Sequence, residues 1–230
     1  AKSGNWWEGE GQRALANNSV NYQSRPSMAT FMREWLSLYE SKSGERGIYS
    51  SYVAKKQVER LNDRYGHRVR STTGDNGGDN GGNVREPRED FGTNPCSEII
   101  LRSREFCNLS EVVVRESDTY ELLENKVRHA TVLGTWQSTL TDFKYLTKEW
   151  ERNCEDERLL GVSLTGIMDH PVMNGSEGED KLIEWLNNLR EVARETNAEY
   201  AQRLGIKPSA SITCVKPSGT VSQLVDSASG

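Results

Sequence analysis

The sequence predicts an α/β fold in which most strand pairs are parallel. Short apolar segments with the character of buried strands occur at residues 106–114, 159–169 and 209–215. Long helical patterns separate them, at residues 118–150 and 178–204. A parallel pair of strands needs a long crossover, usually a helix, so this alternation favours parallel pairing.

The N-terminal part of the chain predicts smaller elements. Residues 17–19 form a turn that leads into a short strand, and Ser27 is a plausible N-cap for a helix ending near residue 41. One stripe of that helix has apolar residues at three- and four-residue spacing, and we expect it to face the core: Met28, Phe31, Met32, Trp35, Leu36 and Tyr39. A turn at residues 44–47 precedes a second, polar helix over residues 52–65.

Residues 71–87 have the lowest complexity in the chain and repeat an Asp-Asn-Gly-Gly unit. A calcium loop would need a terminal glutamate and apolar strand residues, which this segment lacks. We therefore expect a flexible surface insertion within the domain.

The later elements follow in order. Apolar residues 99–101 precede a turn at 102–105 and the strand at 106–114. The apolar side of the helical region at 118–150 is formed by Leu122, Leu123, Val127, Ala130, Thr131 and Gly134. Gly205 should end the helix at 178–204. The apolar face of that helix is formed by Leu182, Leu186, Leu189, Val192 and Ala193.

Composition narrows the possible functions. The 230 residues carry a net charge of -5, which argues against nucleic-acid binding, and no apolar run is long enough to cross a membrane. The four cysteines lack the spacing of a zinc site or a disulfide framework, so we expect no metal site and a reducing, cytoplasmic compartment. Both ends look cut, as in an internal fragment of a longer protein.

The first candidate site is the segment Asn94-Pro95-Cys96-Ser97-Glu98. In an extended backbone its alternate side chains, an amide, a thiol and a carboxylate, would share one face. Such a set suits proton and sulfur chemistry on one substrate. A buried structural cysteine beside a turn proline is the alternative.

Two further features accompany that segment. Cys107 lies eleven residues after Cys96, and a hairpin-like return would bring both thiols together as a two-electron reductant. A turn and probable helix start follow the last strand, where backbone N–H groups would bind phosphate. This turn comprises Pro217, Ser218, Gly219, Thr220, Val221 and Ser222. Two separate buried cysteines and a plain helix start are the alternatives.

Together these motifs resemble the catalytic half of a ribonucleotide reductase. They are Asn94-Pro95-Cys96-x-Glu98, Cys107-Asn108-Leu109, Gly161-Val162-x-Leu164-Thr165-Gly166 and Pro217-Ser218-Gly219-Thr220. The short spacing between Cys96 and Cys107, with the stretch at residues 13–19, is most similar to the adenosylcobalamin-dependent class in its monomeric and phage-borne members. The resemblance implies that residues 1–230 are part of a ten-stranded α/β barrel, with Cys96 on a central finger loop.

The resemblance also implies a mechanism. Adenosylcobalamin would generate a thiyl radical on Cys96, which takes the 3′-hydrogen of a ribonucleotide. Glu98 would remove the 3′-hydroxyl proton, and Asn94 would hydrogen-bond the ribose. Cys107 would be one of two reducing thiols, and the turn at residues 217–222 would hold the substrate phosphates. A thioredoxin-like dithiol would restore the thiols, and a nucleotide effector would bind outside this chain.

The resemblance leaves other points open. The partner of Cys107 and the shuttle cysteines should lie outside residues 1–230, so the fragment alone should not turn over. Cys154 and Cys214 match no family cysteine and are expected to be structural. The alternatives are the large subunit of a diiron-dependent reductase and an inactive nucleotide-binding regulatory barrel.

Overall fold

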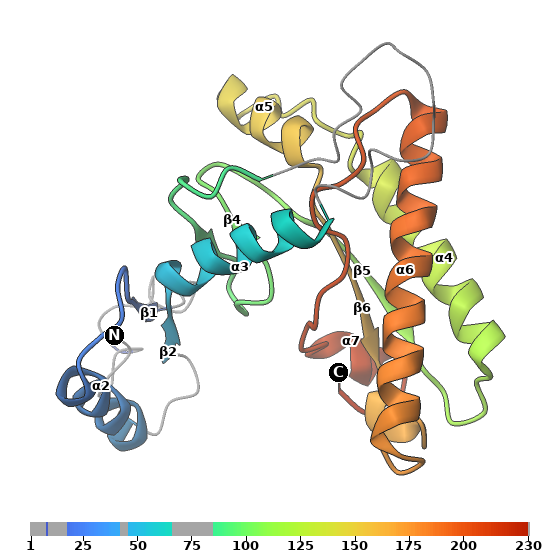
Figure 1. Ribbon diagram of the computed structural model, residues 1–230, viewed down its shortest axis with the longest axis horizontal. Coiled ribbons are helices and arrows are strands. Elements are labelled where there is room, and N and C mark those ends of the chain that lie inside the picture. Colours follow the sequence, from blue (N-terminus) through green and yellow to red (C-terminus); the bar gives the residue numbers. More distant parts are fainter. Residues whose placement is uncertain (1–7, 9–17, 42–45, 66–84, 230) are drawn as a thin grey trace.

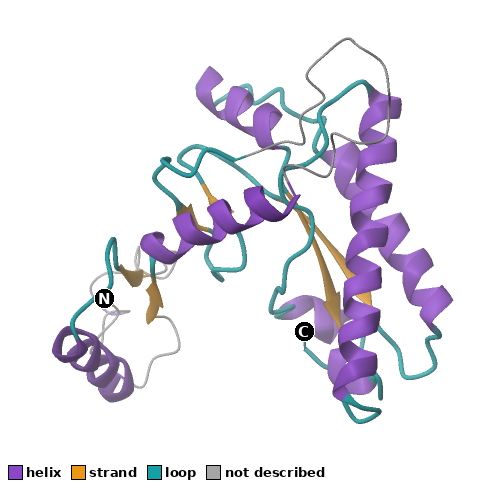
Figure 2. Cartoon of the chain, in the orientation of Figure 1, coloured by secondary structure: helices purple, strands orange, loops and turns teal. Residues whose placement is uncertain are grey.

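The computed structural model describes Glu8 and residues 18–41, 46–65 and 85–229 (Figure 1). Helices and strands mix along the chain, which confirms the α/β class (Figure 2). The elements are β1 Asn18–Asn21, α2 Met28–Ser41, β2 Arg46–Tyr49, α3 Ser51–Tyr65, β3 Gly92–Thr93, β4 Ile100–Leu101, β5 Asn108–Val113, α4 Tyr120–Gln137, α5 Lys148–Glu157, β6 Leu160–Thr165, η3 Ile167–Asp169, α6 Glu179–Leu204 and α7 Thr220–Leu224. Most of the insertion expected at residues 71–87 lies outside the described residues.

Parallel pairing dominates, as predicted. Strands β1 and β2 pair in parallel, and so do β5 and β6, whose register runs from Asn108 opposite Leu160 to Val113 opposite Thr165. Strands β3 and β4 are antiparallel, because they are the two sides of a tight hairpin.

The segment at residues 209–215 differs from the buried strand that we expected. It contributes one parallel bridge, Thr213 with Val162, in which Cys214 N donates to Val162 O at 3.0 Å. Thr213 is exposed and Val215 is 80% exposed. The segment pairs with β6 at the edge of the sheet and then leaves it, so the prediction of a buried strand is wrong.

The main core lies between the β5–β6 sheet and helices α4 and α6, which cover one of its faces (Figure 1). Thr119 caps α4 by accepting a hydrogen bond from Leu122 N at 3.3 Å. Gly134 lets α4 approach the sheet, since a side chain there would meet Leu160 Cδ2 at 3.4 Å. Leu122 and Leu186, expected in the core, are instead 45% and 43% exposed.

Helix α6 ends as the sequence predicts. Gly205 adopts the left-handed conformation, with φ of 67°, that glycine accepts at low cost. Its N–H donates to Gln202 O at 3.1 Å. The sequence thus places both the helix and its last residue correctly.

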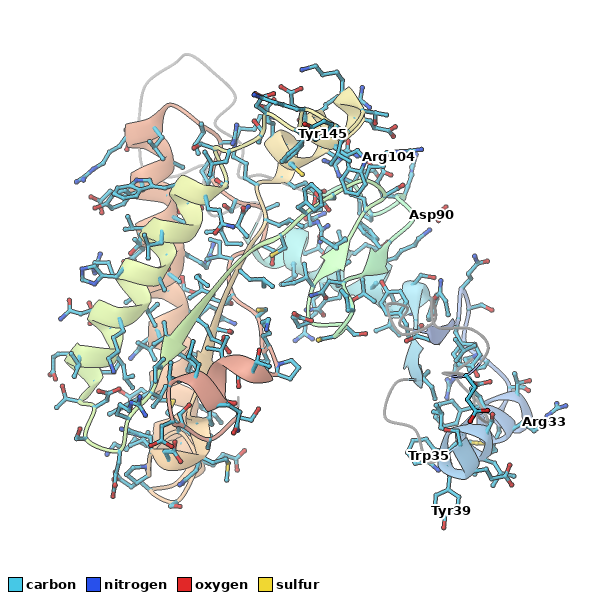
Figure 3. All side chains as sticks on the ribbon, turned by 180° about the vertical axis from the view of Figure 1, so that it is seen from behind. Arg33, Trp35, Tyr39, Asp90, Arg104 and Tyr145 are labelled. Carbon is cyan, nitrogen blue, oxygen red and sulfur yellow. The ribbon has the colours of Figure 1, made fainter. Side chains whose placement is uncertain are left out.

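The stripe of α2 does not enter a core, which corrects the prediction. No residue of α2 is buried, and Trp35 and Tyr39 are 56% and 76% exposed. Figure 3 shows both side chains projecting outward from the helix. The helix itself forms because its pattern and its Ser27 cap are local, whereas burial needs a neighbouring element. In the described part of the chain, no helix is long and apolar enough to span a membrane.

Candidate functional site

The segment from Asn94 to Glu98 is the turn of the β3–β4 hairpin. Asn94 Oδ1 accepts a hydrogen bond from Ile99 N at 3.0 Å, and Ser97 N donates to Asn94 O at 3.0 Å. Ser97 has φ of 64°, which reverses the chain. The extended backbone that we considered is therefore wrong, and a tight loop presents these side chains instead.

The turn separates its thiol from its carboxylate. Cys96 is exposed at the tip, as a central loop requires. Both carboxylate oxygens of Glu98 are buried, and neither has a hydrogen-bond partner among the described residues. A buried carboxylate without hydrogen-bond donors is costly in free energy.

Cys107 lies immediately before β5 and is half-buried. Burial raises the pKa of the Cys107 thiol, and nearby Cys214, Glu105 and Glu98 raise it further against the opposing charge of Arg85. The group therefore stays a protonated thiol at neutral pH. Cys107 is half-buried, whereas Cys96 is exposed, so the two thiols have different environments.

Cys214 was expected to be structural. Its thiol lies on the same side of the β5–β6 sheet as the side chain of Leu109. A side chain at Gly161 would meet Cys214 Sγ at 3.2 Å, Ile99 Cδ1 at 3.2 Å and Leu109 Cδ2 at 2.4 Å. Burial raises the pKa of Cys214 to about 12, and Glu98 adds to the effect. Three side chains from distant segments thus meet over the bare backbone of Gly161.

This convergence predicts that Gly161→Ala is disruptive. The new methyl group must displace Leu109 and press on Ile99 and Cys214, which we expect to cost about 1–3 kcal/mol of unfolding free energy. Denaturant unfolding of the full-length protein checks this, with Gly92→Ala as the control because a side chain at Gly92 meets nothing within 4 Å. Equal stability of the two variants would contradict the packing described for Gly161.

The turn expected to bind phosphate leads into α7. Gly219 has φ of 56°, Ser222 Oγ donates to Gly219 O at 2.9 Å, and Ser218 is 3% exposed. Pro217 and Thr220 are exposed, whereas Val221 is half-buried. The Ser222 hydroxyl therefore helps to shape the turn, and Val221 N donates to Ser218 O at 3.1 Å within it.

Arg115 ties the segment that follows α7 to the end of β5. Its Nη1 donates to Asp226 O at 2.6 Å and its Nη2 donates to Val225 O. Ala228 N donates to Asp169 Oδ2 at 2.8 Å. The carboxyl ends of β5 and β6 thus hold the segment that follows α7.

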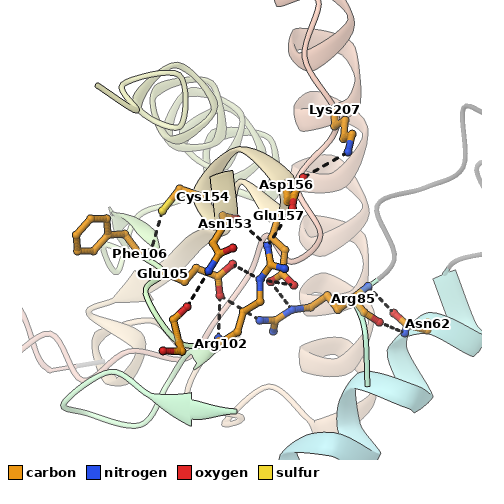
Figure 4. A network of polar contacts seen from close by, with 11 residues as sticks. Asn62, Arg85, Arg102, Glu105, Phe106, Asn153, Cys154, Asp156, Glu157 and Lys207 are labelled. Carbon is orange, nitrogen blue, oxygen red and sulfur yellow. Dashed lines mark hydrogen bonds and ion pairs between the residues drawn. The ribbon is translucent and has the colours of Figure 1, made fainter. Parts of the chain in front are cut away.

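A buried network of charged side chains holds the turn at residues 102–105, which directly precedes Cys107 (Figure 4). Arg85 Nε lies 2.7 Å from Glu157 Oε2, and Arg85 Nη2 lies 3.4 Å from Glu105 Oε2. Arg102 N donates to Glu105 Oε2 at 2.9 Å, and Arg102 Nε lies 3.3 Å from Glu157 Oε1. The network joins the turn before Cys107 to α5, and sequence reasoning missed it.

This network predicts a pH dependence of stability. Burial and the neighbouring Glu157 raise the pKa of Glu105 from 4.5 to about 8. A carboxyl group whose pKa rises on folding stabilises the folded state fully below its unfolded value, and that contribution is lost as the pH rises through about 8.

Glu105→Gln should remove this dependence, because the amide is neutral at every pH. We expect the stability of the wild type relative to the variant to fall by on the order of 2 kcal/mol between about pH 5 and pH 9. Denaturant unfolding of both full-length proteins across this range measures it. Glu149→Gln, at an exposed ion pair with Arg104, is the control. Parallel pH profiles for the wild type and Glu105→Gln would contradict the account.

Comparison with known proteins shows which sequences this chain is similar to. Over 162 residues the chain is 32% identical to an adenosylcobalamin-dependent ribonucleoside-triphosphate reductase of Lactobacillus acidophilus, covering 60% of the chain and 21% of the relative. The enzyme of the same name from Lactobacillus leichmannii is 27% identical over 166 residues, again 60% of the chain and 22% of the relative. The chain is related in sequence to the adenosylcobalamin-dependent ribonucleotide reductases. No family model matches it.

The fold agrees with this relationship. The crystal structure of a B12-dependent (class II) ribonucleotide reductase matches with a TM-score of 0.64 and 22% identity, over 97% of the chain and 32% of that enzyme. The chain therefore has the fold of a part of a class II reductase, which confirms the resemblance seen in the motifs. It spans about a fifth of the length of the curated relatives that it matches.

Cys154 retains its expected structural character in this setting. It is buried in α5, and its Sγ accepts a hydrogen bond from Phe106 N at 3.4 Å. Phe106 stacks on Trp150 with ring centroids 4.6 Å apart. These contacts fix the residue before Cys107.

Proposed function

We propose that the full-length protein containing this chain reduces ribonucleoside triphosphates to deoxyribonucleotides, with adenosylcobalamin as its cofactor, and that residues 1–230 form part of its catalytic domain. The observation that carries the proposal is the hairpin turn that exposes Cys96 and buries the unpartnered carboxylate of Glu98. The names of the related enzymes support triphosphates as the substrates.

Each polar group of the turn has a role in the proposed reaction. Cys96 carries the thiyl radical, takes the 3′-hydrogen of the ribose and returns it to the 3′-carbon at the end of the cycle, which restores the thiyl. Glu98 accepts the 3′-hydroxyl proton, since its oxygens are the unpaired acceptors of the turn. Asn94 Oδ1 is already engaged with Ile99 N, so its Nδ2 is the group that donates to a ribose hydroxyl.

Cys107 supplies one half of the reducing power. Its raised pKa keeps it a thiol, which gives up a proton and an electron as it forms a disulfide. Its partner would be a second cysteine outside this chain. Together the two thiols deliver two electrons and two protons: the 2′-hydroxyl leaves as water, and hydrogen takes its place. A thioredoxin-like dithiol then reduces the disulfide, in the cytoplasm of the cell, or of the host cell if a phage encodes the protein.

The turn fits an external radical source. Pro95, Cys96 and Ser97 are all exposed, so a large cofactor can reach the thiol, and these residues would contact it. Adenosylcobalamin, when bound, would supply the radical to Cys96. The turn at residues 217–222 would hold the substrate phosphates, and a nucleotide effector would act elsewhere in the protein.

A direct assay tests the proposal. The full-length protein is incubated with a ribonucleoside triphosphate and a dithiol, with and without adenosylcobalamin, and deoxyribonucleotide is measured by chromatography. We expect product only with the cofactor. No product with the cofactor, from folded protein, would overturn the proposal, and product that depends on an iron-containing partner subunit would favour the diiron class.

A further inference from the structure

In the described part of the chain, helices α4 and α6 lie on one face of the β5–β6 sheet, whereas Ile99 and Cys214 pack against the other. Ser110 and Leu160 lie beside Gly134 of α4, on the face that α4 and α6 cover. The alternate residues Leu109 and Gly161 face the other way, toward Ile99 and Cys214. By the same alternation, Glu111 and Ser163 belong to this second face. The charge of Glu98 acts on the thiol of Cys214, which also lies there.

This face holds buried polar atoms that have no hydrogen-bond partner among the described residues. Glu111 and Ser163 are directly opposite each other in the register. Glu111 Oε1 and Ser163 Oγ are buried without a hydrogen-bond partner among the described residues, as are both Glu98 oxygens. Ser163 is 2% exposed. Each such atom costs free energy until a donor or acceptor reaches it.

On the side of the sheet that α4 and α6 cover, buried polar side chains have hydrogen-bond partners. Thr131 and Thr135 donate to backbone carbonyls of α4 at 2.8 Å, and Asn197 Nδ2 donates to Thr135 Oγ1 at 2.9 Å. Ser110 Oγ is unpaired there too, so one unpaired hydroxyl proves little. Three unpaired carboxylate oxygens on one face are a stronger indication, because a carboxylate accepts only and needs donors.

We propose that Glu111, Ser163 and Cys214 form a second binding surface, which receives hydrogen-bond donors of the nucleotide that Asn94 and Glu98 do not hold. Such donors are sugar hydroxyls and base amino groups. This inference rests on the proposed function and adds a specificity-determining surface to it. We call these three residues the open-face cluster.

The surroundings of Glu111 are consistent with this role. Burial raises the pKa of Glu111, and the positive charge of Lys216 opposes that effect. The charges of Glu98, Glu111 and Lys216 all act on the Cys214 thiol. Lys216 directly precedes the turn at residues 217–222, where the phosphates are proposed to bind.

Steady-state kinetics of the full-length enzyme test the open-face cluster. We expect Glu111→Gln to raise the KM for at least one ribonucleoside triphosphate about tenfold, and Ser163→Ala to raise it about threefold, since each removes part of a buried hydrogen bond to the ligand. The kcat should change less than about threefold, because no reacting group is lost. Glu116→Gln, an exposed glutamate just beyond β5, is the matched control.

A binding measurement separates this inference from the proposed function. Equilibrium dialysis of the four ribonucleoside triphosphates against Cys96→Ala, alone and combined with Glu111→Gln, measures affinity without turnover. Weaker binding by the double variant supports the open-face cluster even if reductase activity is absent. Affinities and KM values within twofold for all four nucleotides, in proteins with unchanged thermal unfolding, would overturn it even if the enzyme is a reductase.

Discussion

Replacing Cys96 with alanine in the full-length protein should abolish deoxyribonucleotide formation completely. Cys96 is the exposed thiol of the hairpin turn, and no other side chain of the turn can carry a thiyl radical. We expect loss not only of turnover but also of hydrogen exchange between solvent and the adenosyl carbon of the cofactor. Product chromatography and tritium exchange measure the two effects.

Cys154→Ala is the matched control for that result. Cys154 is buried, and its Sγ accepts a hydrogen bond from Phe106 N. Its loss should therefore lower the stability of the protein, while deoxyribonucleotide formation and hydrogen exchange at the cofactor persist. Exchange retained by Cys96→Ala at the wild-type rate would refute the radical role of Cys96.

Glu98→Gln should reduce turnover by about 10²–10⁴-fold, the usual contribution of a general base. The amide keeps the shape of the carboxylate but cannot accept the 3′-hydroxyl proton. Radical formation on Cys96 does not need this group, so hydrogen exchange at the cofactor should persist. Measuring both kcat and hydrogen exchange in this variant therefore distinguishes the role of Glu98 from that of Cys96.

Glu116→Gln again serves as the control for the loss of one glutamate charge. Glu116 is exposed and lies outside the turn at residues 94–98, so its replacement should leave kcat unchanged. Turnover of Glu98→Gln within tenfold of the wild type would contradict the role of Glu98 as base.

Local sequence patterns predicted the elements of this fold well. The helix at residues 178–204 and its terminal Gly205 follow from apolar periodicity and from the left-handed conformation that glycine allows. The same periodicity predicted α2 but not its exposure, because a stripe shows that one face is apolar and not what covers it. The segment at residues 209–215 failed for a similar reason, since an apolar run does not show whether a strand has neighbours on both sides.

The candidate site also has features that the sequence predicts and features that depend on long-range contacts. Its motif residues could be chosen from the sequence, but the turn conformation of residues 94–98 depends on the β3–β4 pairing. Cys214 joins the site only because its segment bonds to β6 beside Gly161. Arg85 and Glu157 are 72 residues apart in the chain, so no local pattern could pair them.

The central claim is that the thiol of Cys96 takes hydrogen from the ribose while Glu98 takes the proton. The most direct measurement uses a ribonucleoside triphosphate tritiated at the 3′-carbon, the full-length protein, adenosylcobalamin and a dithiol, with tritium counted in water and in product. We predict that the wild type releases part of the tritium to water during turnover and that Cys96→Ala releases none. Tritium released to water by Cys96→Ala would contradict the account.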